Sequence, residues 1–350
     1  MIPSVRELLE ARVGTRSGEV FLFSAADGRD WTYREFDAAV NRTANMLRSN
    51  GIGKGDVVSL LLPNSAEYVI AYFACWKIGA VAGPVSSLLK PDEIEWVVGN
   101  SESRLMLIGR SEPPAVAGGL SESPRDSKRV SEPRIQPPAT TGGSDSCRQI
   151  VFDNVSIADN FPDTLDHVDI DTDDEAIIIY TSGTTGKPKG CLLTHGNLIA
   201  NARQIAEWMN FTESDRLLTV MPLFHMNGVS VTTLTALYAG GSTVVAPKFS
   251  SSKFWETVEK YRITSFGSVA TMLSMLLSGP RPQVPGPKSD NPKSKIQNPK
   301  SKIRNASFRN VRFRTRPSGG PEEIRRDIRR ARDRGLRFER IDLSVDVQSP

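Results

Sequence analysis

The 350-residue sequence contains few cysteines and no long hydrophobic run. Its three cysteines, Cys75, Cys147 and Cys191, lack metal-binding spacing and cannot all pair with one another, which favours a reducing, cytoplasmic compartment. No apolar stretch approaches the roughly 18 residues that a membrane-spanning helix needs. The first residues also lack the apolar core of a secretory signal peptide. We therefore expect a globular protein without a transmembrane segment.

Positive charge is scarce outside the C-terminal end. Residues 279–350 hold 19 Lys and Arg against 8 Asp and Glu, whereas the preceding residues are net negative, although the whole chain has a formal charge of +4. A basic end can bind nucleic acid, but the Lys-rich part of this one, residues 279–306, contains no aromatic residue, and the end has no recognisable nucleic-acid-binding module. We favour a solvated tail and keep nucleic-acid binding as the weakest of the alternatives.

A stretch rich in Gly, Thr and Lys, residues 177–198, is the most informative part of the sequence. An apolar strand leads into YTSGTTGKPKG (180–190), and a second short strand follows before a helix for which Thr194 is the expected N-cap. Glycines let the backbone approach a ligand, and successive N–H groups form an anion-binding concavity. The pattern predicts a polyphosphate site, although a hairpin with a solvated lysine tip would have a similar composition. It is not a Walker A loop, because Pro188 stands where that motif has Ser or Thr.

The string 180–190 resembles the phosphate-loop signature of the adenylate-forming (AMP-binding) superfamily, which includes the acyl-CoA synthetases. The resemblance implies that a carboxylic acid attacks the α-phosphate of ATP and that the thiol of coenzyme A (CoA) then displaces AMP. In the family Mg²⁺ accompanies ATP, but we assign no metal ligand here. The implied nucleotide-binding residues are Thr181, Ser182, Gly183, Thr184, Thr185, Gly186, Lys187 and Lys189.

Two further segments resemble parts of the family's acyl site. PLFHMNG (222–228) resembles the P-x-F-H segment, whose histidine lies beside the carboxylate and the nucleotide, which implies a catalytic, substrate-bordering role for His225. Residues 264–274 resemble the segment that lines the acyl pocket, which implies substrate contacts for Gly267 and Val269. Core packing explains these two residues equally well, and a lone histidine is more often structural. Within the family the chain is most similar to acyl-CoA synthetases of the fatty- or medium-chain type.

Strands and helices alternate through most of the chain, which predicts an α/β fold with a parallel sheet. The resemblance implies the stacked α/β subdomains of the adenylate-forming N-terminal domain. We place the first subdomain at residues 1–108 and the second, with the phosphate loop, at residues 149–278.

Local signals predict how two of the helices begin. The spacing of apolar residues predicts a helix over 34–50, with Thr32 and Glu35 in a capping box. A second box, Asn64 with Glu67, is expected before a helix that is apolar on nearly all sides and therefore packed between layers.

Three segments break the alternating pattern. Residues 109–148 are rich in Ser, Pro and Gly and predict a disordered insertion. Residues 279–306 include the near-identical heptads NPKSKIQ and NPKSKIR, a low-complexity repeat that also predicts disorder. Residues 307–350 are an Arg-rich, degenerate tail, in which 310–328 faintly resembles the family's strand and nucleotide-binding turn.

Some family motifs have no counterpart in the sequence. We find no Y-G-x-T-E or Y-x-T-G-D segment and no C-terminal domain with the catalytic lysine, so the resemblance covers residues 4–277. We therefore expect a truncated, catalytically impaired acyl-CoA synthetase. An inactive nucleotide-binding remnant is the main alternative.

Overall fold

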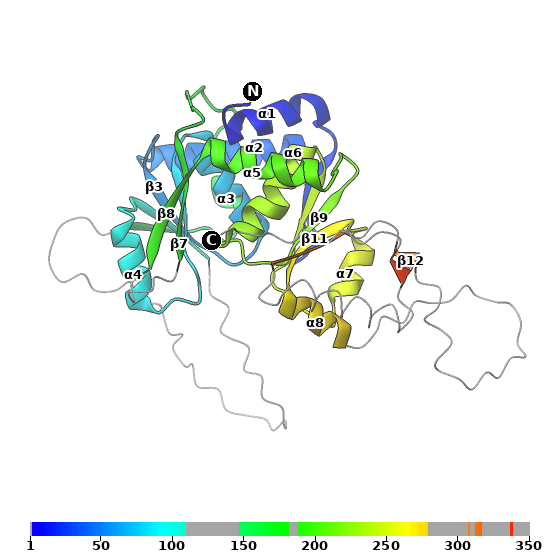
Figure 1. The fold of residues 1–350 in the computed structure, drawn as a ribbon. Helices are drawn as coiled ribbons and strands as arrows, with labels where there is room; N and C mark the ends of the chain where they lie inside the picture. Colours follow the sequence, from blue (N-terminus) through cyan, green and yellow to red (C-terminus); the bar gives the residue numbers. More distant parts are fainter. Residues whose placement is uncertain are drawn as a thin grey trace, which may run out of the picture.

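The structure is a computed structural model that describes residues 2–109, 147–181 and 188–278 and the strand segments 307–308, 312–316 and 337–338. It contains two six-stranded sheets. Helices α2, α3, α5 and α6 lie in the middle of the molecule, with one sheet on each side (Figure 1). The α/β class and the two stacked sheets that the sequence predicts are confirmed.

The first sheet has the strand order β6-β5-β3-β4-β7-β8. Its strands are parallel except for the antiparallel pair β7–β8 at one edge. The strands are β3 (Val57–Leu61), β4 (Val81–Pro84), β5 (Leu105–Ile108), β6 (Arg148–Val151), β7 (Glu175–Thr181) and β8 (Lys189–Thr194).

The second sheet has the order β13-β11-β9-β10-β1-β2. It is parallel except for the β1–β2 hairpin. The strands are β1 (Val20–Ser24), β2 (Asp30–Thr32), β9 (Arg216–Thr219), β10 (Ser242–Val245), β11 (Ser265–Val269) and β13 (Arg312–Arg316), and a separate pair joins β12 (Ser307–Phe308) to β14 (Arg337–Phe338).

The sheets do not follow the division into residues 1–108 and 149–278. The N-terminal strands β1 and β2 join the second sheet, and β7 and β8 join the first. The chain therefore starts in one sheet, builds the other and returns. Local sequence patterns locate strands but do not reveal which strands pair, since pairing depends on residues far apart in the chain.

The helices begin largely where local signals place them. Thr32 and Glu35 form the expected capping box, with the Glu35 N–H donating to Thr32 Oγ1 and the Thr32 N–H to Glu35 Oε2. The second expected box is wrong, because Ser65 caps α3 while Asn64 bonds to a distant loop. The helices are α1 (Val5–Arg16), α2 (Tyr33–Ser49), α3 (Ala66–Lys77), α4 (Pro91–Asn100), α5 (His195–Trp208), α6 (Thr235–Ala239), α7 (Phe254–Lys260) and α8 (Ala270–Ser278), with a 3₁₀ turn η1 (Val155–Ala158) and a π-helix η2 (Asn227–Leu234).

Helix α3 is buried along its whole length, as its all-round apolar sequence predicts. Its aromatic rings pack on one another, with 5.1 Å between the centroids of Tyr68 and Tyr72. The polar ends of these side chains reach backbone carbonyls on both sides. Trp76 Nε1 donates to Ala176 O of β7 (2.8 Å), and Tyr72 Oη donates to Leu223 O (2.8 Å). Helix α3 thus joins the first sheet to the loop after β9.

The predicted insertion is narrower than expected. The Gly109 N–H donates to Leu61 O (3.0 Å), and Arg148 is the first residue of β6. Both ends of the segment 109–148 are therefore part of the fold, while its interior, 110–146, and the repeat at 279–306 lie outside the described residues. Among the helices that the structure describes, none is long and apolar enough to cross a membrane.

A buried ion pair joins the three helices that cover this part of the core. The Lys77 side chain is 3% exposed, and its Nζ lies 2.6 Å from Asp37 Oδ1 and 2.8 Å from Asn41 Oδ1. The Lys77 carbonyl accepts a hydrogen bond from Arg6 of α1 (3.0 Å). Because the ammonium is shielded from water, removing Asp37 leaves a buried charge with only the half-exposed Glu10, at 3.7 Å, as an acidic partner.

We predict that Asp37→Ala lowers the free energy of unfolding by about 3 kcal/mol, since breaking a buried pair costs several kcal/mol. Urea denaturation checks this. Asp166→Ala is the matched control, because Asp166 pairs with Arg48 at 3.4 Å on the surface and exposed pairs contribute about 0–1 kcal/mol. Equal midpoint shifts in the two variants would contradict the prediction.

Candidate functional site

The β7–β8 hairpin carries the predicted phosphate loop at its tip. The two strands pair from Glu175↔Thr194 to Thr181↔Lys189, and β8 is the outer strand of the sheet. Thr181 and Lys189 are therefore the last paired residues on either side of the loop, and both are exposed. The other predicted nucleotide-binding residues, from Ser182 to Lys187, lie outside the described residues.

Side chains of α4 pack against the hairpin at the base of the loop. Tyr180 lies edge-on to Trp96 of α4, with ring centroids 6.0 Å apart, and its hydroxyl donates to Asn100 Oδ1 (2.9 Å). Gly190 leaves room for this arrangement, since a Cβ there would lie 3.0 Å from Ile178 Cδ1 and 3.2 Å from the Tyr180 ring. One glycine of the sequence signature therefore serves packing at the base of the loop.

Helix α5 follows β8 of the hairpin with no loop between them. Thr194 caps it, accepting from the Asn197 N–H (3.2 Å), as the sequence predicts, although the helix begins two residues earlier than expected. The next residue, His195, is fully buried, and its Nδ1 accepts from the Val5 N–H of α1 (3.3 Å). Burial lowers the pKa of His195 to about 4; Asp174 opposes this shift and Lys54 adds to it. The ring is therefore neutral at pH 7.

The segment with His225 is held in place by side chains at and just before α3. Asn64 accepts from the Leu223 N–H (2.8 Å) and donates to Met221 O (2.9 Å). His225 itself is exposed, with its ring 4.5 Å from that of Phe224, and partial burial lowers its pKa below the usual value. A neutral imidazole can donate or accept a hydrogen bond beside a carboxylate.

The π-helix η2 begins two residues after His225. Gly228 lets the start of η2 pack closely against the backbone of the preceding residues 221–223, since a Cβ at residue 228 would lie 2.6 Å from Pro222 O. Thr232 and Thr233 donate to Gly228 O (2.9 and 3.0 Å), and these bonds compete with regular α-helical bonding. Short π-helical turns are rare and often occur at functional sites.

Gly267 lies on β11, against the start of η2. A Cβ on Gly267 would lie 2.5 Å from Asn227 Oδ1, so the strand and the π-helix are in direct contact at this point. Val269 ends β11 and is partly buried. The structure thus brings Gly267 next to the His225 segment through Asn227. The sequence analysis did not single out Asn227, although it is a polar residue at the start of an apolar helix.

The hairpin and the His225 segment are connected through α5. This helix continues from β8 and packs on η2, where Ser230 Oγ donates to Asn201 Oδ1 (2.7 Å). Helix α5 therefore contacts both β8 and η2.

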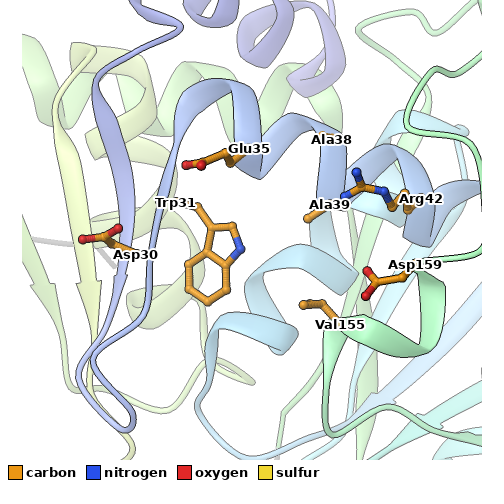
Figure 2. Close-up of a pocket in the computed structure, with 8 residues that line it drawn as sticks. All are labelled: Asp30, Trp31, Glu35, Ala38, Ala39, Arg42, Val155 and Asp159. Atoms are coloured by element: carbon orange, nitrogen blue, oxygen red, sulfur yellow. The ribbon is translucent and has the colours of Figure 1, made fainter.

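A cavity of about 310 Å³ lies elsewhere, between β2, α2 and η1. The Trp31 indole stands near its centre, with Glu35, Arg42 and Asp159 around it (Figure 2). None of the predicted site residues lines this cavity. We therefore assign it no part in the chemistry of the phosphate loop.

The two sheets and the Gly- and Thr-rich hairpin define an α/β domain of the nucleotide-binding, adenylate-forming class. The family described as AMP-binding enzyme matches residues 9–321, and the chain belongs to this family. The match extends beyond residue 277, where the sequence analysis ended the resemblance. It includes β13, which lies in the tail and pairs in parallel with β11.

Known proteins support this assignment. The chain is 32% identical over 251 residues to a crotonobetaine/carnitine–CoA ligase of Escherichia fergusonii, covering 71% of this chain and 47% of that protein. It thus spans about half the length of the curated relatives it matches. The inhibitor-bound N-terminal domain of FACL13 from Mycobacterium tuberculosis has the same fold (TM-score 0.71, 24% identity, 98% of this chain and 75% of that chain). So does the AMP complex of O-succinylbenzoate CoA synthetase from Bacillus subtilis (TM-score 0.67, 24% identity, 95% and 71%).

We predict that Asn64→Ala destabilises the chain by about 2 kcal/mol, because its two short hydrogen bonds, of roughly 1 kcal/mol each, are lost along with a longer one to Ala246 O (3.4 Å). It should also speed amide exchange at Leu223, measured by hydrogen–deuterium exchange. Asn45→Ala is the matched control, since Asn45 also makes two side-chain bonds to carbonyls (Pro162 and Thr164, both 2.8 Å) but far from this segment. Unchanged exchange at Leu223 in Asn64→Ala would show that Asn64 does not hold the segment.

The buried His195 predicts a dependence of stability on pH. Its folded-state pKa, about 4, lies below the unfolded value of about 6.5, so the unfolded state binds the proton more readily. The contribution of the neutral His195 to stability is therefore fully present above pH ~6.5. The free energy of unfolding falls by about 3 kcal/mol as the pH drops to ~4. In His195→Asn this component should disappear from unfolding free energies measured between pH 7.5 and 4. Parallel pH profiles for the two proteins would refute the prediction.

Proposed function

We propose that this chain is the ATP- and acid-binding part of an acyl-CoA synthetase. A carboxylic acid attacks the α-phosphate of ATP, giving an acyl-adenylate and releasing pyrophosphate. The CoA thiol then displaces AMP to give the thioester. Membership of the AMP-binding family and the similarity to a CoA ligase support this reaction. A fatty acid is the proposed acid class, for which the support is the sequence resemblance alone.

The geometry of the β7–β8 hairpin is the observation that carries the proposal. The last pair of the hairpin, Thr181↔Lys189, flanks a segment whose sequence is rich in Gly, Ser, Thr and Lys, and we propose that this segment forms a phosphate-binding turn. Such a turn offers backbone N–H groups, hydroxyls and an ammonium to the phosphates of ATP. We propose that residues 181–187 and Lys189 hold these phosphates and orient the α-phosphate for attack.

We propose that His225 borders the carboxylate of the acid, as the neighbouring segment resembles the family's acyl site. A neutral imidazole there can hydrogen-bond the carboxylate without fixing it as a tight ion pair. Gly267 and Val269 are proposed to line the acyl chain. Positioning of this kind is the main way a protein accelerates a transfer at phosphorus.

Mg²⁺ is proposed as the companion of the ATP phosphates, whose charge it would neutralise. Within residues 2–109, 147–181 and 188–278, no three His, Cys, Asp or Glu side chains converge to hold a metal ion. We therefore assign no residue to the ion and no step to it. We also propose a cytoplasmic location, supported by the three cysteines, none of which is paired in the structure.

Acid-dependent exchange of labelled pyrophosphate into ATP tests the proposal directly. Exchange that requires one class of carboxylic acid would support adenylate formation. ATP binding without exchange for any acid would instead favour the alternative of a nucleotide-binding module without ligase activity. Failure to bind ATP would contradict both.

We predict that Thr184→Ala combined with Lys187→Ala weakens ATP binding about 100-fold or more, since hydrogen bonds to charged groups contribute roughly 1.5–3 kcal/mol each. Isothermal titration calorimetry measures this. Lys248→Ala is the control, because Lys248 is exposed on a loop after β10. This substitution removes one positive charge, as Lys187→Ala does, but away from the proposed site. Equal ATP affinity in the double variant and the control would remove the loop from the proposed site.

A further inference from the structure

Among the residues that the structure describes, none forms a hydrogen bond with the side chain of Asn227. It is the first residue of η2, two positions after His225. Its Oδ1 is buried without a hydrogen-bond partner, and no hydrogen bond of its Nδ2 is recorded within the part of the chain that the structure describes. A buried polar atom without a partner costs about 1–3 kcal/mol. Such a residue calls for a physical explanation.

Gly267 is what admits Asn227 to this position. A Cβ at residue 267 would lie 2.5 Å from Asn227 Oδ1 and 3.4 Å from Thr232 Cγ2, so any larger residue would displace the amide. The backbone of Gly267 lies in β11 and does not have the positive φ that favours glycine. Glycine is therefore needed at residue 267 because it has no side chain, and not because of its backbone freedom.

The carboxamide has two ends, and only one of them lies against Gly267. Asn227 as a whole is only partly buried, so the other end can meet a ligand. The assignment of oxygen and nitrogen in an amide can be reversed by a flip about χ2. The free end is then a donor in one orientation and an acceptor in the other. A hydroxyl matches both, whereas an alkyl chain matches neither.

We propose that Asn227, seated on Gly267, selects carboxylic acids whose chain carries a hydroxyl over acids with a plain alkyl chain. This inference rests on the proposed function, because it places the acid chain beside η2, against the end of the Asn227 amide that faces away from Gly267. A plain chain would bury the amide without a partner, and a buried polar group left unpaired is a strong source of discrimination. Asn227 therefore acts as a specificity residue for the acid.

Binding of non-hydrolysable acyl-adenylate analogues to the 350-residue chain tests this. The probes are acyl-sulfamoyl-adenosines of straight-chain acids, each paired with analogues in which one chain carbon carries a hydroxyl. We expect at least one hydroxylated analogue to bind about tenfold more tightly than its parent, as one hydrogen bond of about 1.4 kcal/mol requires. Equal affinities throughout the series would overturn the inference.

Two variants locate the preference. Asn227→Leu should abolish the tenfold ratio, because the plain parent then leaves no amide unpaired and binds about as tightly as its hydroxylated analogue. Gly267→Ala should abolish the same ratio by displacing the amide, and the double variant should lose no more than either one. Gly99→Ala is the matched control, because a Cβ there meets nothing within 4 Å, and it should keep the ratio.

These outcomes distinguish a failure of this inference from a failure of the proposed function on which it rests. A ratio that survives in Asn227→Leu overturns the role of Asn227 while acid binding stands. Wild-type protein that binds neither ATP nor any analogue contradicts the proposed function and, with it, the inference. Thermal melting of each variant shows whether it is folded, and the ratio within one folded protein does not depend on its stability.

Discussion

The burial of helix α3 between the two sheets is the constraint on which the rest of the structure depends. All of its residues are shielded from water, and each large side chain contributes roughly 1.5–3 kcal/mol when fully buried. Its aromatic residues also carry polar atoms, and these reach Ala176 on one side and Leu223 on the other. One apolar helix thereby sets the position of the β7–β8 hairpin relative to the His225 segment.

The path of the chain explains why neither sheet can be assembled from a continuous half of the sequence. Strands β1 and β2 belong to the sheet that is completed only after residue 216, and β7 and β8 close the sheet that begins at Val57. One core of buried side chains runs from Phe21 of β1 through α3 to Leu217 of β9. A second cluster packs Phe266 of β11 on Leu218 of β9 and Val244 of β10. The first core therefore joins the two sheets, while β11 rests on the second cluster.

The candidate acyl site is built from polar groups in unusual places. Thr232 and Thr233 bond to the carbonyl of Gly228, which accompanies the π-helix, and Asn227 lies on a glycine of the neighbouring strand. Departures from regular structure of this kind cost stability and are concentrated at sites of function. The same geometry explains why glycine is needed at residues 228 and 267, since backbone atoms or an amide occupy the space of a side chain.

The sequence by itself determined the features that depend on near neighbours. The alternation of strands and helices, the caps at Thr32 and Thr194 and the glycine-rich loop signature all follow from residues within a few positions of one another. Only the tertiary structure decided which strands pair, that Asn64 bonds to a loop 159 residues away instead of capping α3, and that Asn227 meets Gly267. These contacts join distant residues, and the same local pattern is compatible with several partners. The positions of residues 182–187 remain a prediction from the sequence signature, while the path of the strands on either side of them comes from packing against α3 and α4.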